Sequence, residues 1–212
     1  MSTLEEVRNA VEAGKTKLVP ELIQGALDAG HSAQDILQAM IDSMMVVGNK
    51  FSAGEIFVPE MLIAAKAMAR GVDVLKPLLT GKSGVSLGKC VIGTVAGDLH
   101  DIGKNLVSMM LESAGFEIID LGVDVPAARF VEAVKNNDNV TLVACSALLT
   151  TTLPAMRETV QTLKSSGLGG FKVMVGGAQV SPDFAAAIGA DGFAPDAGLA
   201  AEKAVELVKT LN

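Results

Sequence analysis

A short loop around residue 100 holds the side chains best suited to chemistry. It reads Gly97-Asp98-Leu99-His100-Asp101-Ile102-Gly103 and precedes a helix predicted to begin near Lys104. A neutral imidazole binds borderline transition metals well, and Asp98 could accept a hydrogen bond from the other ring nitrogen of His100, fixing the tautomer and raising the basicity of the ligand. Gly97 and Gly103 would let a bulky group approach the backbone. The loop predicts a metal site with His100 as ligand; a helix-capping Asp98 beside an exposed histidine is the simpler alternative.

Polar and small residues also follow two later apolar runs. The run 140–146 ends in Ser146, and Leu148 and the hydroxyls of Thr150, Thr151 and Thr152 come next. These hydroxyls could hold a polar ligand tail or simply cap the helix predicted to start near residue 153.

The run 172–175 is followed by Gly176, Gly177 and Ala178. A glycine pair in this place opens a slot between strand and helix or makes a tight turn. Because the carboxyl ends of parallel strands meet at one edge of a sheet, we expect all three loops to converge on one ligand site.

The elements that must position these loops are strands and helices in alternation. Short apolar runs alternate with amphipathic stretches from Lys89 onward, which predicts an α/β fold with a doubly wound, flavodoxin-like parallel sheet. Helices are expected up to Ala114, after Pro126 and through Val160. The expected strands span residues 90–96, 117–121, 140–146 and 172–175.

The first half of the chain has helical periodicity from Thr3 to about Leu79. Capping-box patterns at Thr3 with Glu6 and at Ser32 with Asp35 predict two helix starts. The second helix is expected over residues 17–29, the third to loosen at Gly48, and the fourth to start near Pro59. Four helices with short connections predict an antiparallel bundle.

A small, polar, Gly-rich segment separates the two periodicities. We therefore expect a helical bundle at 1–80, a linker at 81–88 and an α/β domain at 89–212.

Composition narrows the classes of partner. Seventeen Lys and Arg face twenty-four Asp and Glu, for a net charge of -7, and no basic cluster suits nucleic acid. The N-terminus shows no apolar segment long enough for a signal peptide or a membrane span, so a soluble, cytoplasmic protein is expected. Cys90 and Cys145 lie in apolar runs and are expected to be buried free thiols. Trp and Tyr are absent, so strong visible or 280 nm absorbance would come from a bound group.

The motifs together resemble a known family. Asp98-x-His100-x-x-Gly103, then Ser146-x-Leu148, then Gly176-Gly177 resemble the DxHxxG, SxL and GG signature of domains that bind cobalamin with its nucleotide base displaced. More specifically, GDLHDIGKNLV and the DLGVDVP of residues 120–126 are similar to the corrinoid proteins of anaerobic methyltransferase systems and to cobalamin-dependent methionine synthase. The helical half is similar to the bundle that covers the cobalt in those proteins, so the resemblance spans nearly the whole chain.

The resemblance implies a role for each site residue. His100 would replace the dimethylbenzimidazole base below cobalt, Asp98 would hold His100 and exchange a proton, and Thr152, where methionine synthase relatives have Ser, would extend this relay. Ser146, Leu148, Gly176 and Gly177 would line the slot for the nucleotide tail. The full set of expected cofactor-binding residues is Gly97, Asp98, Leu99, His100, Asp101, Ile102, Gly103, Ser146, Leu148, Thr150, Thr152, Gly176, Gly177, Ala178 and Phe193.

The resemblance also implies a reaction cycle. Cobalt(I) would accept a methyl group from a substrate:corrinoid methyltransferase, and methylcobalt(III) would deliver it to an acceptor methyltransferase that uses tetrahydrofolate or a thiol, with a reductive activator as third partner. The chain alone would not be catalytic. Phe57, Met61 or Leu62 would cover the upper cobalt face, and the linker would let the bundle move aside. Methanol, methylamines, betaines and methoxylated aromatics all remain open as donors.

Three alternatives compete with this reading. A cobalamin-dependent sensor would share the cofactor, but no output segment is visible. The small subunit of an adenosylcobalamin mutase would need a barrel partner in place of the bundle. A flavodoxin-like module in which His100 is incidental explains neither the motifs nor the helical half.

Overall fold

The computed structural model describes residues 3–79 and 87–211. The chain forms two compact units, a helical unit and a sheet unit that begins at Leu87. Most of the expected linker, residues 81–86, lies outside the described residues. Its last two residues already belong to the sheet unit, because Thr141 Oγ1 donates to the Leu87 carbonyl at 2.6 Å and the Glu117 N–H donates to that of Gly88 at 3.1 Å.

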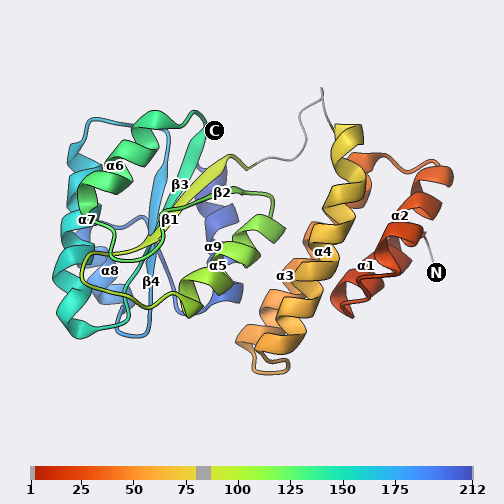
Figure 1. Ribbon diagram of the computed structural model, residues 1–212, viewed down its shortest axis with the longest axis horizontal. Coiled ribbons are helices and arrows are strands. Elements are labelled where there is room, and N and C mark those ends of the chain that lie inside the picture. The colour runs from red at the N-terminus through yellow and green to blue at the C-terminus, as the bar shows by residue number, and fades with distance from the viewer. Residues whose placement is uncertain (1–2, 80–86, 212) are drawn as a thin grey trace. The chain divides into compact units, whose positions relative to one another are not determined.

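The helical unit contains the four predicted helices (Figure 1). They are α1 (Thr3–Glu12), α2 (Val19–Asp28), α3 (Ala33–Ser52) and α4 (Val58–Leu79). Ser32 caps α3 as expected, accepting the Asp35 N–H at 3.1 Å. Thr3, by contrast, already lies inside α1.

The prediction that α3 loosens at Gly48 is wrong. Gly48 is buried within a helix that continues to Ser52. A helical glycine costs about 1 kcal/mol relative to alanine, and the packing of α3 against α1 and α4 outweighs it. The buried face of α3 includes Ile36, Met40, Met44 and Val47, whose spacing is that of one helical stripe.

The sheet unit is the predicted doubly wound fold. Five parallel strands lie in the order β2-β1-β3-β4-β5, with β1 (Lys89–Thr94), β2 (Glu117–Asp120), β3 (Val140–Ser146), β4 (Lys172–Gly176) and β5 (Gly192–Ala194). Figure 1 shows α6, α7 and α8 over one face and α5 and α9 over the other. Their bounds are α5 (Ile102–Ser113), α6 (Ala127–Asn136), α7 (Leu153–Ser165), α8 (Pro182–Ile188) and α9 (Ala197–Lys209), and a 3-10 turn, η1 (Thr150–Thr152), precedes α7.

The strand order fixes where a ligand can bind. The chain leaves β1 toward β2 on one side and returns to β3 on the other, which makes β1 and β3 the point where the winding reverses. Ligands of such sheets bind beyond the carboxyl ends of the strands at this point. The loops after β1 and β3, which carry His100 and Thr152, are therefore the ones that must meet.

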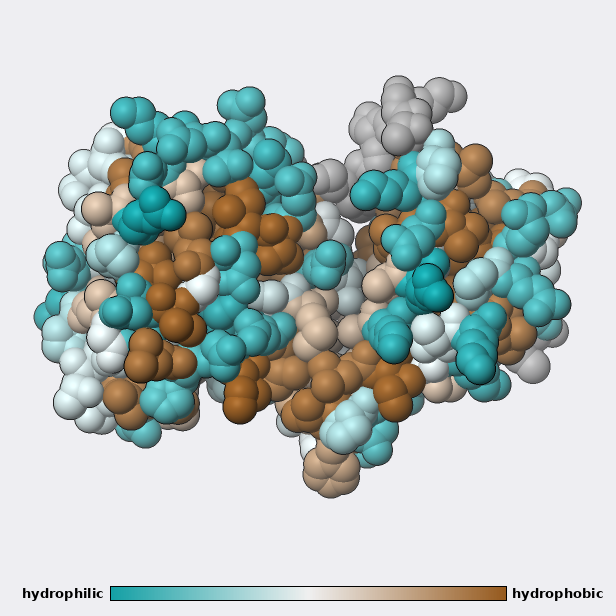
Figure 2. All heavy atoms as spheres, viewed as in Figure 1, coloured by the Kyte–Doolittle hydropathy of each residue, from teal (hydrophilic) through white to brown (hydrophobic). Residues whose placement is uncertain are grey.

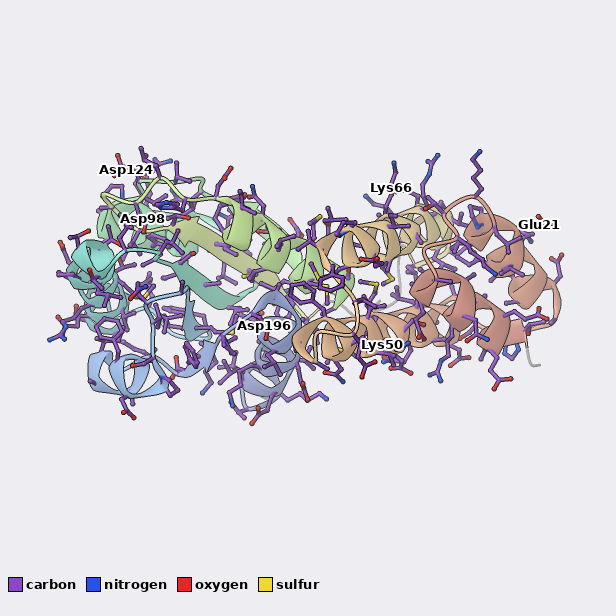
Figure 3. All side chains as sticks on the ribbon, turned by 90° about the horizontal axis from the view of Figure 1, so that it is seen from below. Glu21, Lys50, Lys66, Asp98, Asp124 and Asp196 are labelled. Atoms are coloured by element: carbon purple, nitrogen blue, oxygen red, sulfur yellow. The ribbon has the colours of Figure 1, made fainter. Side chains whose placement is uncertain are left out.

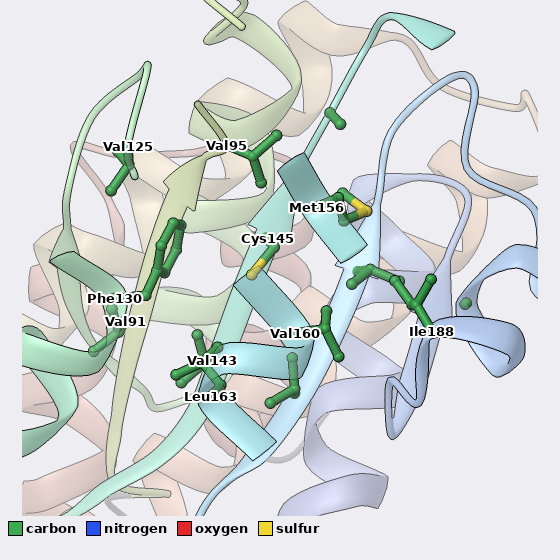
Figure 4. Packing of buried hydrophobic residues seen from close by; sticks show 14 of the residues in the cluster. Val91, Val95, Val125, Phe130, Val143, Cys145, Met156, Val160, Leu163 and Ile188 are labelled. Atoms are coloured by element: carbon green, nitrogen blue, oxygen red, sulfur yellow. The ribbon is translucent and has the colours of Figure 1, made fainter. Parts of the chain in front are cut away.

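An apolar cluster between the sheet and α6, α7 and α8 holds these strands in place (Figure 4). Val91, Val143 and Cys145 from the strands pack with Phe130 of α6 and Val160 of α7. Both cysteines are buried and free, as predicted. The strands that carry the site loops thus belong to a tightly packed core.

No described helix is long and apolar enough to cross a membrane. On the face drawn in Figure 2, apolar surface is interspersed with hydrophilic side chains in both units. Among the exposed apolar side chains are Phe57, Ile63, Leu99 and Ile102.

Candidate cofactor-binding site

The loop between β1 and α5 folds back over the end of β1. Gly97 adopts a φ of +79°, the Asp98 N–H donates to the Val95 carbonyl at 3.1 Å, and Thr94 Oγ1 donates to the carbonyl of His100 at 2.8 Å. The helix begins at Ile102, slightly earlier than predicted. This turn brings the Asp98 and His100 side chains to the carboxyl edge of the sheet.

Asp98 and His100 form the pair that the sequence predicts. The Nδ1 of His100 lies 2.7 Å from Asp98 Oδ1, and the same oxygen accepts the His100 backbone N–H at 3.1 Å. Asp98 is fully buried, whereas 52% of the His100 side chain is exposed. Because Asp98 holds Nδ1, the other ring nitrogen, Nε2, is the one left for a metal.

The second oxygen of Asp98 is held by the loop after β3. Oδ2 accepts the Leu148 backbone N–H at 2.7 Å and the Thr152 hydroxyl at 2.8 Å. Thr152 is buried and makes no side-chain capping bond to α7. Asp98 and Thr152 are therefore bound to each other instead of serving as the helix caps of the simpler alternative.

These contacts set the charge of Asp98. Burial alone would raise the pKa of its carboxyl group, but the hydrogen bonds from Leu148, from the ring and the N–H of His100 and from Thr152 outweigh burial and hold the pKa well below its usual range. Asp98 is therefore ionised at neutral pH and can only accept hydrogen bonds, so the proton of the pair lies on His100 Nδ1.

The surroundings of His100 suit a large apolar ring. Leu99 is 72% exposed, Ile102 is 77% exposed and Leu149 is 41% exposed. Exposed large apolar side chains in the loops that hold a half-exposed imidazole would suit a large, mostly apolar ring whose metal His100 would hold. The residues present thus fit a corrinoid with a histidine lower ligand.

Two predicted glycines have a structural role that the sequence did not reveal. A Cβ on Gly177 would lie 1.9 Å from the Ala147 carbonyl oxygen, and one on Gly176 would lie 2.8 Å from that of Ala194. Close approach of neighbouring strand ends therefore already requires glycine at both positions. Their lining of a nucleotide slot stays a prediction.

The remaining predicted residues are more dispersed. Thr150 lies exposed in η1 and Ala178 is exposed beyond β4, whereas Ser146 is half-buried at the end of β3. Asp101 accepts a hydrogen bond from the Asn105 side chain at 3.2 Å. Phe193 lies in β5, partly buried against the apolar cluster. The structure thus joins Gly97, Asp98, His100, Leu148 and Thr152 most closely.

Sequence reasoning missed three polar residues beside the loop. Asp124 Oδ1 accepts the Gly97 N–H at 2.7 Å, and the buried Lys104 lies 2.5 Å from Asp120 Oδ2. Figure 3 shows Asp98 and Asp124 at the same end of the sheet unit. Both aspartates belong to the DLGVDVP segment, so this motif was the sequence feature that could have identified them.

Family models described as B12 binding domains match both units. One matches residues 88–205, which is more than half of the chain, and another matches residues 3–76. The sheet unit and the helical unit are thus each assigned to a cobalamin-binding region.

Individual proteins give the same result. Dimethylamine corrinoid protein 1 of Methanosarcina acetivorans is 44% identical over 207 residues, which cover 96% of this chain and 91% of the relative. A crystal structure of a cobalamin-binding protein from Desulfitobacterium hafniense superposes with a TM-score of 0.83 at 34% identity, covering 96% and 98% of the two chains. A chain of the methanol:cobalamin methyltransferase complex MtaBC from Methanosarcina barkeri gives 0.80 at 30% identity, covering 98% and 80%. The chain therefore belongs to the corrinoid proteins of methyltransferase systems, which bind a cobalamin or related corrinoid.

Proposed function

We propose that this protein is a methyl carrier that receives a methyl group from a substrate:corrinoid methyltransferase and delivers it to an acceptor methyltransferase. The observation that carries the proposal is the 2.7 Å contact between His100 Nδ1 and the buried Asp98. It leaves Nε2 of a half-exposed histidine as a metal ligand, within a chain of the corrinoid family.

A bound corrinoid would supply the cobalt centre on which a methyl group is taken up and released. The chain would supply the lower ligand through His100 Nε2. Asp98 keeps the ring in one tautomer and one orientation, and Leu148 and Thr152 hold Asp98 in place. The ionised Asp98 would stay hydrogen-bonded to Nδ1 whether Nε2 of His100 held a metal or a proton.

The helical unit would cover the upper face of the cofactor. We expected Phe57, Met61 or Leu62 to provide this cover, and Met61, which is 1% exposed, is the least available of the three. Phe57 is 69% exposed and Leu62 is 37% exposed, which leaves both side chains available for this role. Met61 points into the core because it occupies the inner stripe of α4 with Ala65 and Met68.

The partners follow from the same proposal. The relatives named for dimethylamine make a methylamine methyltransferase the first donor partner to test. A tetrahydrofolate or thiol methyltransferase would be the acceptor partner, and a reductive activator would restore the lowest cobalt oxidation state. Two buried free thiols agree with a reducing cytoplasm.

The first test is cofactor binding. Protein reconstituted with hydroxocobalamin and desalted should keep a red colour. Because the chain has no Trp or Tyr, its absorbance near 280 nm should also come largely from the cofactor. His100→Ala should change the visible spectrum, whereas His31→Ala, which removes the other of the two histidines, should not. A colourless, folded wild-type protein would contradict the proposal.

The second test is transfer. The loaded and reduced protein should become methylated with dimethylamine and its methyltransferase, and Asp98→Asn should slow this step. A loaded protein with the expected spectrum that no donor methyltransferase methylates would favour the cobalamin sensor instead.

A further inference from the structure

The segment between β2 and α6 runs beside the loop that carries His100 and bonds to it repeatedly. The Val125 N–H donates to the Thr94 carbonyl at 2.9 Å, and the Thr94 N–H donates to the Gly122 carbonyl at 3.0 Å. Val95 and Val125 form a further parallel bridge. This segment therefore extends the pairing of β1 beyond the end of β2, from Thr94 to Val95.

Asp124 anchors the start of the His100 loop. Its Oδ1 accepts the Gly97 N–H at 2.7 Å, and its own N–H donates to the Asp98 carbonyl at 2.9 Å. Its φ is +54°, a left-handed conformation that costs most residues energy but that Asn and Asp tolerate. Asp124 therefore holds both the Gly97 N–H and the Asp98 carbonyl at the start of the His100 loop.

Asp120, the last residue of β2, anchors the far end of the loop by binding Lys104 in the first turn of α5. Lys104 Nζ lies 2.5 Å from Asp120 Oδ2 and 2.7 Å from Asn105 Oδ1, and the Lys104 side chain is only 2% exposed. The other oxygen of Asp120 accepts the Gly122 N–H at 2.8 Å. A buried lysine requires a paired charge, so this ion pair fixes where α5 starts.

We infer that Asp124 and the Lys104–Asp120 pair are positioning residues for the lower metal ligand, a role that rests on the proposed function. They hold the two ends of the loop from Gly97 to Lys104, and His100 lies between them. Both anchors act through the loop and helix backbone, whereas Asp98 acts on the imidazole itself. Loosening either anchor should let Nε2 of His100 move away from its ligating position.

Three variants of Asp124 separate the hydrogen bond from the backbone conformation. Asp124→Asn keeps an acceptor for the Gly97 N–H and tolerates a positive φ. Asp124→Gly adopts the same φ without strain but has no acceptor. Asp124→Ala lacks the acceptor and is also strained. We expect Asp124→Asn to resemble the wild type. Asp124→Gly should lose His100 coordination as Asp124→Ala does.

Apolar replacement tests the second anchor without leaving a buried charge. Lys104→Met combined with Asp120→Leu removes both partners and should still fold. Circular dichroism of the cofactor-free variants checks folding before any measurement on the cofactor.

The measurement is electron paramagnetic resonance of the full chain loaded with hydroxocobalamin and reduced by one electron. Coordination by one histidine nitrogen splits the cobalt signal, and 15N-labelled histidine changes the splitting. Asp124→Gly should lower the ratio of coordinated to uncoordinated histidine by about tenfold, the effect expected of one hydrogen bond to a charged group. The double variant, which removes an ion pair, should lower it at least as much. Asp124→Asn should stay within about twofold of the wild type.

The outcomes are distinct. Nitrogen splitting in the wild type that Asp124→Gly and the double variant leave unchanged would overturn the positioning role alone. A wild-type spectrum without histidine splitting would overturn His100 ligation, and this inference with it. Faster hydrogen exchange of the Gly97 amide in cofactor-free Asp124→Gly, with other amides unchanged, is the accompanying result expected if the anchor is local.

Discussion

Thr152 donates its hydroxyl hydrogen to Asp98 Oδ2 across 2.8 Å, from a position 54 residues further along the chain. The Leu148 N–H donates to the same oxygen, whereas the ring and the N–H of His100 occupy the other oxygen. The Asp98 carboxylate therefore joins two loops: its Oδ1 binds the loop after β1, and its Oδ2 binds the loop after β3.

Removing the Thr152 hydroxyl tests this link. Thr152→Val keeps the shape of the side chain but leaves a buried oxygen of Asp98 with one donor fewer, which should lower the free energy of unfolding by about 1 kcal/mol. Thr152→Ser keeps the hydroxyl and should lie closer to the wild type. Urea denaturation of the cofactor-free protein measures both. A serine variant as unstable as the valine variant would show that the methyl group, and not the hydroxyl, matters.

Asp98 should also make stability depend on pH. Burial opposes ionisation of its carboxyl group, but its four hydrogen bonds hold the folded-state pKa below the unfolded value. The resulting stability is fully present above the ordinary aspartate pKa of about 4 and is lost as the pH falls below it. Asp98→Asn should lower the free energy of unfolding at pH 7 by roughly 2 to 4 kcal/mol and flatten its decline in acid.

Urea unfolding from pH 7 to pH 3 measures that difference, with Asp138→Asn at an exposed position as the matched control. Parallel stability curves for Asp98→Asn and the wild type would contradict the assignment of a depressed pKa.

The two thiols should be inert in the folded protein. Burial raises the pKa of Cys145 to about 12, and burial together with the neighbouring Cys145 raises that of Cys90 further. Because the thiolate is the reactive form, neither should react with Ellman's reagent at pH 8 until guanidinium unfolds the chain. Reaction of either thiol within minutes under native conditions would contradict their burial in β1 and β3.

Gly177→Ala should destabilise the sheet unit whether or not a cofactor is present. The new Cβ would lie 1.9 Å from the Ala147 carbonyl oxygen at a φ of +130°, so we expect a loss of roughly 2 to 4 kcal/mol. Gly169→Ala, where no atom lies within 4 Å of the new Cβ, is the matched control. Thermal unfolding of both cofactor-free variants measures this loss of stability. An unchanged unfolding midpoint for Gly177→Ala would contradict the close approach of Gly177 to Ala147.

The sequence was sufficient for the parts of the site that depend on local pattern. The alternation of apolar runs predicted the strand ends, and a doubly wound sheet then required the loops with His100 and Thr152 to meet. The spacing of Asp98 and His100 allowed their contact to be predicted, because both lie in one turn.

Features that depend on distant backbone could not be read from the chain. Asp124 combines a left-handed conformation with a bond to Gly97, which lies 27 residues earlier. Gly177 is required by the Ala147 carbonyl, a neighbour only after β3 and β4 pair. Gly48 looked like a helix end because its helix propensity is poor, and the packing of α3 against α1 and α4 outweighs that propensity.

The pairing of β1 with β3 also dictates when this site can form during folding. Asp98 gains its Leu148 and Thr152 donors only after β3 has added to β1, a closure over 50 residues or more. A folding nucleus made of β1, α5 and β2 would leave the carboxylate in water. We therefore expect Thr152→Val to speed unfolding in chevron measurements and to leave the refolding rate nearly unchanged. A slower refolding rate in the variant would place the contacts of Asp98 with Leu148 and Thr152 in the folding nucleus. An unchanged refolding rate would mean that the chain fixes the position of His100 only after the folding transition state.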